Sequence, residues 1–121
     1  MATVTAVTAQ QFTKEEAARL VDLIGRATTD SLDLAPQYKD IYLQSLPEGF
    51  TTKLEQPRIT FFVYTAPNKT QEQKRRLIQA YQAAVDTFYG GAGKVGTVVI
   101  FKIHDDVNVG VNGTMRLDAK K

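Results

Sequence analysis

Cysteine is absent from the 121-residue sequence, which excludes disulfide bonds, thiolate metal sites and a cysteine nucleophile. The sequence also lacks tryptophan and holds one histidine, His104, and two serines, Ser31 and Ser45. A Ser-His-Asp hydrolase therefore has almost no side chains to draw on. A zinc site would have to combine the one histidine with carboxylates alone. We expect no metal ion and no cofactor.

Long apolar runs and a strong net charge are also missing. No segment approaches the roughly 18 apolar residues of a membrane helix, and residues 1–8 lack the basic region and apolar core of a signal peptide. The net charge of +2 is too small to indicate nucleic-acid binding. Residues 1–56 are acidic and residues 57–121 basic, an asymmetry that either helps subunits associate or reflects solvated surfaces. We expect a cytoplasmic protein that binds neither membranes nor nucleic acids.

What the sequence does contain is an internal duplication, which appears when it is compared with itself at an offset of 57 residues. Thr3, Thr13 and Leu20 then fall on Thr60, Thr70 and Leu77, and Ile41-Tyr42-Leu43 falls on Val98-Val99-Ile100. The unbroken order of such matches indicates two copies of one element. We expect a single domain over 1–121, made of two pseudo-repeats (1–49 and 57–106) followed by a C-terminal tail (107–121).

Each copy has the pattern of a strand, a helix and a second strand. Alternating or β-branched residues predict strands over 2–8, 39–46, 58–65 and 96–103. The segments Thr13-Lys-Glu-Glu16 and Thr70-Gln-Glu-Gln73 are capping boxes that begin the helices. Two strands joined by such a helix lie parallel. The tail alternates apolar residues and reaches Asn112-Gly113, which favours a short hairpin or edge strand.

The fold class is therefore α/β (α+β): tandem β-α-β units forming a four-stranded mixed sheet with two helices on one face. Such a sheet leaves its other face uncovered. Phe61, Phe62 and Val63 are consecutive, so both sides of that strand are apolar. We expect the bare face to mediate self-association. A ferredoxin-like RNA-binding module has the same outline, but the aromatic basic segment that it requires is missing.

Several polar features have two interpretations. His104 beside Asp105 and Asp106 either forms a proton relay or lies in a surface turn, and we favour the turn. The Gly-rich segment 90–93 follows a helix, so it indicates a helix stop and not a phosphate loop. The basic run 74–76 is spread around a helix and favours a solvated face. Tyrosines near the strands either pack in the core or interface or line a pocket.

The doubled, capped β-α-β pattern resembles the tautomerase superfamily, which includes 4-oxalocrotonate tautomerase, macrophage migration inhibitory factor and cis-3-chloroacrylic acid dehalogenase. Residues 67–78 look like the loop and helix start of the short tautomerases. Pro36-Gln-Tyr38 and Asn108-Val-Gly-Val-Asn112 look like the first helix end and the C-terminal tail of the inhibitory factor. The resemblance spans the chain and implies a homotrimer in which three pairs of units close into a barrel of sheets.

The sequence departs from the family at its catalytic residue. The family's chemistry depends on an N-terminal proline amine with a lowered pKa, whereas this sequence begins Met1-Ala2-Thr3. Pro57 lies within the chain, and its amide nitrogen is not basic. A primary α-amine on Met1 or Ala2 has an ordinary pKa of about 7.7–8.0, which burial lowers, so it is the candidate catalytic base or Schiff-base nucleophile.

The family's binding positions are also changed. Lys69 stands where short members carry an arginine, and it would attract a carboxylate as a point charge. The dehalogenase's substrate histidine falls on Thr28, and Lys39 lies close to the position of an inhibitory-factor lysine. With Tyr38 and Tyr64, these are the expected ligand-binding residues. The resemblance implies weak or altered keto–enol tautomerase or isomerase activity on a small carbonyl or carboxylate compound; the alternative is a catalytically inactive trimer that binds a ligand or protein.

Overall fold

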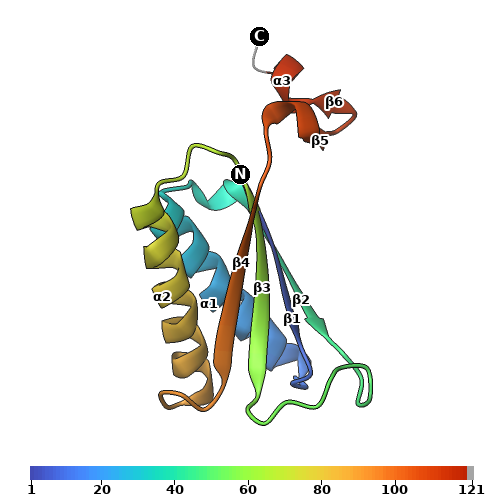
Figure 1. Cartoon of the computed structure of the whole chain (residues 1–121), viewed down its shortest axis with the longest axis vertical. Coiled ribbons are helices and arrows are strands. Elements are labelled where there is room, and N and C mark those ends of the chain that lie inside the picture. The colour runs from blue at the N-terminus through green and yellow to red at the C-terminus, as the bar shows by residue number, and fades with distance from the viewer. Residues whose placement is uncertain (120–121) are drawn as a thin grey trace.

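The computed structural model describes residues 1–119, which form one mixed sheet, two long helices and a small C-terminal unit (Figure 1). The sheet has the strand order β2-β1-β3-β4, with β1/β2 and β3/β4 parallel and β1/β3 antiparallel. Both long helices cover the same face, as the sequence predicted. The elements are β1 (Ala2–Thr8), α1 (Lys14–Leu32), β2 (Lys39–Ser45), β3 (Arg58–Thr65), α2 (Gln71–Tyr89), β4 (Gly96–Ile103), β5 (Gly110–Val111), β6 (Thr114–Met115) and α3 (Arg116–Ala119).

Both predicted capping boxes are present and begin the helices at matching positions. The backbone N–H of Thr13 donates to Glu16 Oε1 at 2.8 Å, and the N–H of Glu16 donates to Thr13 Oγ1 at 3.1 Å. Thr70 and Gln73 make the same reciprocal bonds at 2.8 and 3.1 Å. These bonds satisfy amides of the first turn that have no partner within the helix. The helices therefore start 57 residues apart, in agreement with the duplication.

The register of the two central strands reveals a pseudo-two-fold axis. Thr5 pairs with Phe62 across the antiparallel β1/β3 interface, and these two residues are themselves equivalent at the 57-residue offset. A two-fold axis through this pair exchanges the two copies. It places the start of β1 and the start of β3 at opposite ends of the sheet.

The outer strands correct one detail of the sequence comparison. Ile41 pairs with Val4, whereas Phe61, the equivalent of Val4, pairs with Val99. The offset of the outer strands is therefore 58, and the predicted match of Ile41 with Val98 is wrong by one residue. Both loops have six residues, 33–38 and 90–95, so the shift lies in the pairing: Lys39 pairs with Ala2, whereas Gly96 pairs with Arg58, the equivalent of Met1. A one-residue slip moves a strand residue to the other face.

The hydrophobic core lies between the helices and the face of the sheet that they cover. Its largest side chains, Phe61 and Tyr81, stack with ring centroids 4.3 Å apart and are fully buried. The opposite face carries exposed apolar side chains, among them Tyr42 and Ile100, which are 58% and 47% exposed. This is the uncovered face that the sequence predicted.

The tail forms the hairpin that its sequence indicates. Asn112 and Gly113 both have positive φ angles, 52° and 82°, as a two-residue type I′ turn between β5 and β6 requires. Figure 1 shows this unit projecting beyond the end of the sheet that holds the N-terminus. Its apolar side chains Val107, Met115 and Leu117 are exposed. Within residues 1–119, no helix is both long and apolar enough to cross a membrane.

Candidate functional site

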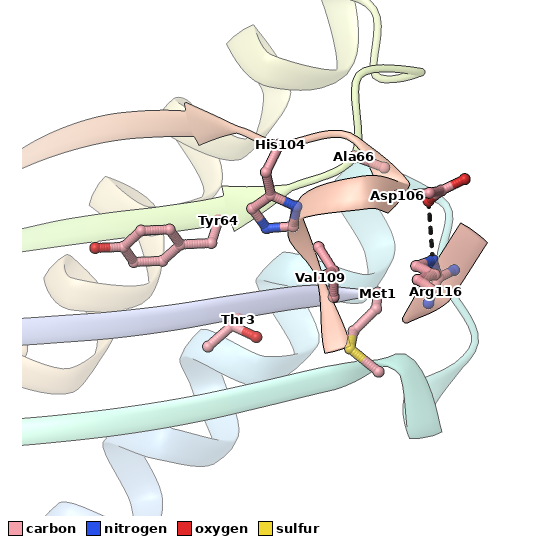
Figure 2. A pocket seen from close by; sticks show the side chains of 8 residues that line it. All are labelled: Met1, Thr3, Tyr64, Ala66, His104, Asp106, Val109 and Arg116. Atoms are coloured by element: carbon pink, nitrogen blue, oxygen red, sulfur yellow. Dashed lines mark ion pairs between the residues drawn. The ribbon is translucent and has the colours of Figure 1, made fainter. Parts of the chain in front are cut away.

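The start of β1 opens onto a cavity of about 60 Å³ at the tail end of the sheet (Figure 2). The topology explains its position. Because β3 is antiparallel to β1, it ends where β1 starts, and β4, parallel to β3, ends there as well. The chain after β4 then folds over this edge. The cavity is lined by Met1, Thr3, Tyr64, Ala66, His104, Asp106, Val109 and Arg116.

Hydrogen bonds hold the walls of this cavity together. Thr65 Oγ1 donates to the carbonyl oxygen of Met1 at 3.4 Å, and the N–H of His104 donates to the carbonyl oxygen of Thr65 at 3.1 Å. The N–H of Arg116 donates to the carbonyl oxygen of Val109 at 2.8 Å, which closes the tail onto itself. The first residue, the ends of β3 and β4 and the tail thus form one connected unit.

The cavity contains ionisable side chains in a half-buried setting. Arg116 Nε lies 3.4 Å from Asp106 Oδ1, and the two side chains are 32% and 25% exposed. His104 Nδ1 is buried and has no hydrogen-bond partner among residues 1–119. A buried polar atom left unpaired costs free energy, so this nitrogen is suited to contact a ligand or to exchange a proton.

A wider groove of about 530 Å³ adjoins the cavity on the other side of the first residue. Met1, Ala66 and Arg116 line both hollows, and the groove adds Tyr38, Asn68 and Lys69, with Leu34 and Ala119. The structure therefore brings Lys69 and Arg116, two cationic side chains, to the sides of Met1. Of the residues expected from the sequence, Met1, Tyr38 and Lys69 meet in this groove, and Tyr64 lies in the cavity.

Lys69 also faces the end of α1. The pKa of the Asp33 carboxyl is lowered mainly by hydrogen bonds from Gln73 and Arg76, with smaller contributions from the charges of Arg76 and Lys69. Asp33 Oδ2 accepts from both donors at 3.0 Å. Two other groups already donate to this carboxylate, so Lys69 is not needed as its hydrogen-bond partner, and Lys69 also lines the groove.

The other expected residues lie elsewhere. Thr28 is fully buried, and its hydroxyl lies 2.7 Å from the Tyr81 hydroxyl, so no ligand reaches it. The side chain of Ala2 is fully buried under the sheet. Lys39 Nζ donates to the carbonyl oxygen of Pro36 at 3.0 Å, and its alkyl chain runs across Gly25. Thr28 and the side chain of Ala2 are thus part of the core, and Lys39 supports the turn at residues 36–38.

The sequence interpretation weighed His104 as a proton relay but favoured a surface turn, and it did not include Arg116 in the site. His104 could have been identified, because it follows a strand predicted to end beside the first residue. Arg116 carries no such signal, since its position depends on how the tail folds back. No group of three His, Asp or Glu side chains with the geometry of a metal site occurs within residues 1–119.

Comparison with known proteins reveals fold similarity without close sequence similarity. No protein-family profile and no curated protein sequence matches the chain. The crystal structure of native fused 4-OT matches with a TM-score of 0.85 at 18% identity, covering 98% of this chain and 99% of that one. Q0 fused 4-OT, a symmetric trimer, matches at 0.84 with 20% identity over 98% and 99%.

Macrophage migration inhibitory factor from Toxoplasma gondii matches with a TM-score of 0.69 at 13% identity, over 91% of this chain and 96% of that one. The similarity extends over nearly the whole chain in each case. The protein therefore has the fold of the tautomerase superfamily, as its sequence resemblance predicted.

Proposed function

We propose that this protein acts on a small carbonyl or carboxylate compound as a keto–enol tautomerase or isomerase of weak or altered activity. The observation that carries the proposal is the position of Met1. The first residue lines both the cavity and the groove, with Lys69 and Arg116 at its sides and His104 across the cavity. An α-amine at this position would lie close to a bound anionic substrate and to His104, which can exchange a proton.

In the proposed reaction, Lys69 and Arg116 attract the carboxylate of the substrate in the groove. The α-amine at the start of β1 accepts the proton from the enol hydroxyl, and its ammonium form returns a proton to the neighbouring carbon, which yields the ketone. His104 lies on the opposite wall and can relay this proton from the enol oxygen to the amine. A primary α-amine has an ordinary pKa of about 7.7–8.0, so both of its protonation states are populated near neutral pH.

The proposal includes a homotrimer in the cytoplasm. The uncovered sheet face has exposed Tyr42, Tyr64 and Ile100, and the tail exposes further apolar side chains. Q0 fused 4-OT, which shares the fold, is a trimer. Sedimentation should give three times the mass of the chain, and a stable monomer at micromolar concentration would contradict this part of the proposal.

A second candidate is a catalytically inactive tautomerase-fold trimer that binds a ligand or a protein. The sequence favours it because residues 1–35 contain no proline, whereas the family's chemistry depends on an N-terminal proline. The cavity that Met1 shares with His104 is only about 60 Å³, which leaves little space for a substrate between these two residues. This candidate predicts that carboxylates bind in the groove and are released unchanged.

Conversion of enol to keto phenylpyruvate separates the two candidates. We expect a rate well above buffer, and we expect Lys69→Ala to raise KM about tenfold, since a hydrogen bond to a charged group contributes about 1.5–3 kcal/mol. Lys14→Ala, which removes an exposed cation at the start of α1 outside both hollows, is the matched control and should leave KM unchanged. Binding without turnover would favour the inactive trimer, and equal KM values for the two variants would remove Lys69 from the site.

A further inference from the structure

The pseudo-two-fold axis relates the backbone around the Met1 cavity to the backbone at the opposite end of the sheet. A pocket of about 260 Å³ lies there, where β3 starts and β1 and β2 end. Five lining residues of the first cavity have equivalents in the second, at an offset of 57 in the inner strands and 58 after the outer strands. The pairs are Met1 with Arg58, Thr3 with Thr60, Tyr64 with Val7, Ala66 with Ala9 and His104 with Leu46.

Matching hydrogen bonds show that the backbone is arranged in the same way at the two ends of the sheet. The N–H of Leu46 donates to the carbonyl oxygen of Thr8 at 2.8 Å, just as the N–H of His104 donates to the carbonyl oxygen of Thr65 at 3.1 Å. Thr8 Oγ1 in turn donates to the carbonyl oxygen of Arg58 at 2.9 Å, which mirrors the bond from Thr65 Oγ1 to Met1. The second pocket is therefore a structural counterpart of the first and not an incidental surface hollow.

The chemistry of the second pocket differs from that of the first. Leu46 and Val7 replace His104 and Tyr64, and Leu54 and Phe62 extend the apolar wall. Of the residues that the structure describes, Arg58 is the one ionisable residue that lines this pocket. Within residues 1–119, its guanidinium has neither an ion pair nor a side-chain hydrogen bond.

Arginine at the position of Met1 changes what the pocket can do. A guanidinium stays protonated at any physiological pH, so it cannot serve as a base, but its planar fork binds a carboxylate through two hydrogen bonds. The hydroxyls of Thr60 and Thr52 line the same pocket and can complete the contacts. Apolar walls around one cation suit a ligand with one charged end and an apolar body.

Two carboxylates limit the charge of this ligand. Glu48 and Glu55 line an adjoining open hollow together with Lys53 and Arg58. Neither glutamate forms an ion pair with Arg58. Their negative charges oppose a second anionic group on the ligand, because like charges at short range repel.

We propose that this Arg58 pocket is a second, non-catalytic ligand site that binds a small monocarboxylate with an apolar or aromatic body. Its occupation does not require any reaction at Met1, and the proposal does not rest on the activity suggested above.

The test is a titration of the full chain with 3-phenylpropanoate, which cannot enolise, followed through backbone amide NMR shifts. We expect the amides of Ala9, Thr52 and Thr60 to shift and saturate. Arg58→Ala should weaken this response at least about tenfold, the effect of losing a charged hydrogen-bonding partner. Arg58→Lys, which keeps the charge and loses the fork, should fall between the two.

Controls separate this site from the Met1 groove. Lys69→Ala should leave the response of the Arg58 pocket unchanged, and unaltered amide shifts around Ala66 in Arg58→Ala would verify its fold. The neutral 3-phenylpropan-1-ol should bind at least tenfold more weakly than the acid. No shift at Ala9, Thr52 and Thr60 at millimolar ligand, equal binding of the alcohol, or an unchanged response in Arg58→Ala would each overturn the proposal.

Discussion

The two ends of the sheet share a backbone frame and differ in their side chains. At one end, Met1, just before β1, lines a cavity with His104, Tyr64 and the Arg116–Asp106 ion pair. At the other end, Arg58 begins β3 among apolar side chains. The duplicated strands fix where a pocket forms, and the residues around each pocket decide its chemistry. Arg58 lies within the chain, so its backbone nitrogen is an amide without a basic lone pair. The Arg58 end therefore cannot use a backbone amine as a catalytic base.

The largest expected effect concerns the core, where the two halves also differ. Tyr81 occupies in α2 the position that Ile24 occupies in α1, and its ring stacks on Phe61. Tyr81→Ala should lower the free energy of unfolding by about 3–5 kcal/mol, because it leaves a large cavity between both helices and the sheet. Urea unfolding measures this.

Two further variants measure the contribution of the Tyr81 hydroxyl and the cost of a small truncation at the equivalent position in α1. Tyr81→Phe keeps the ring and removes the bond to Thr28, whose hydroxyl still donates to the carbonyl oxygen of Ile24 at 2.8 Å, so we expect a loss of about 0.5–1.5 kcal/mol. Ile24→Val, at the equivalent position, should cost about 0.5–1.5 kcal/mol. A Tyr81→Ala loss no larger than that of Ile24→Val would contradict the central role of the stacked pair.

Replacing His104 by leucine, the residue at the equivalent position 46, tests whether this side chain causes the chemical difference between the two pockets. His104→Leu gives the Met1 cavity the side chain of the Arg58 pocket, and we expect kcat for phenylpyruvate to fall at least about tenfold, since a positioned acid–base group contributes 10²–10⁴-fold. Stability should be retained or rise slightly, because the unpaired Nδ1 is removed. Unchanged kcat would show that the histidine only fills space.

The helix ends provide a smaller contrast. Asp33 and Gly90 occupy equivalent positions, and both have the left-handed backbone conformation, with φ angles of 55° and 71°. Gly90→Ala should lower the free energy of unfolding by about 1 kcal/mol through backbone strain, since no atom lies near the added Cβ. Thermal unfolding measures this loss of stability. Ala83→Gly, at an exposed position in the middle of α2, provides a second glycine–alanine exchange for comparison. No loss in Gly90→Ala would contradict the strained conformation.

The smallest expected effect is the pH response at the end of α1, where Asp33 carries a carboxylate and the equivalent Gly90 does not. Hydrogen bonds from Gln73 and Arg76 lower the pKa of Asp33 from its ordinary value of 3.8. The stability that its carboxylate contributes is therefore present above the ordinary pKa and is lost as the pH falls through the lower, folded-state value. Asp33→Asn should be slightly less stable than the wild type at pH 7 and equally stable in strong acid. A constant difference across this range would contradict the assignment.

Local patterns predicted most of the fold. The capping boxes at Thr13 and Thr70 and the alternation in the strands depend on neighbouring residues, so their positions could be derived from the sequence. The one-residue shift of β4 against β2 could not, because it lies in how β4 pairs with β3 and leaves no periodic signal in the sequence. Thr28 shows the corresponding limit for the site: its residue type suits a ligand contact, but its place on the buried side of α1 is set by packing against Tyr81.

Arg116 shows why the other residues of the site could not be predicted from the sequence. It lies beyond a hairpin whose turn is predictable, yet the direction in which that hairpin returns depends on contacts with the ends of β3 and β4. Lys69 was identified only through the family resemblance, and Tyr38 also as one of the tyrosines near the strands. The structure adds that both lie in one groove with Met1.

The most direct test of the account asks whether the chemistry belongs to the Met1 end. The rate of phenylpyruvate ketonisation should be measured against pH on protein whose first residue is verified by mass, before and after selective blocking of the α-amine, with Arg58→Ala alongside. We predict an inflection at or below the ordinary α-amine pKa of about 7.7–8.0, a rate abolished by the block, and an unchanged rate in Arg58→Ala. A rate that survives the block, or that disappears in Arg58→Ala, would contradict the account.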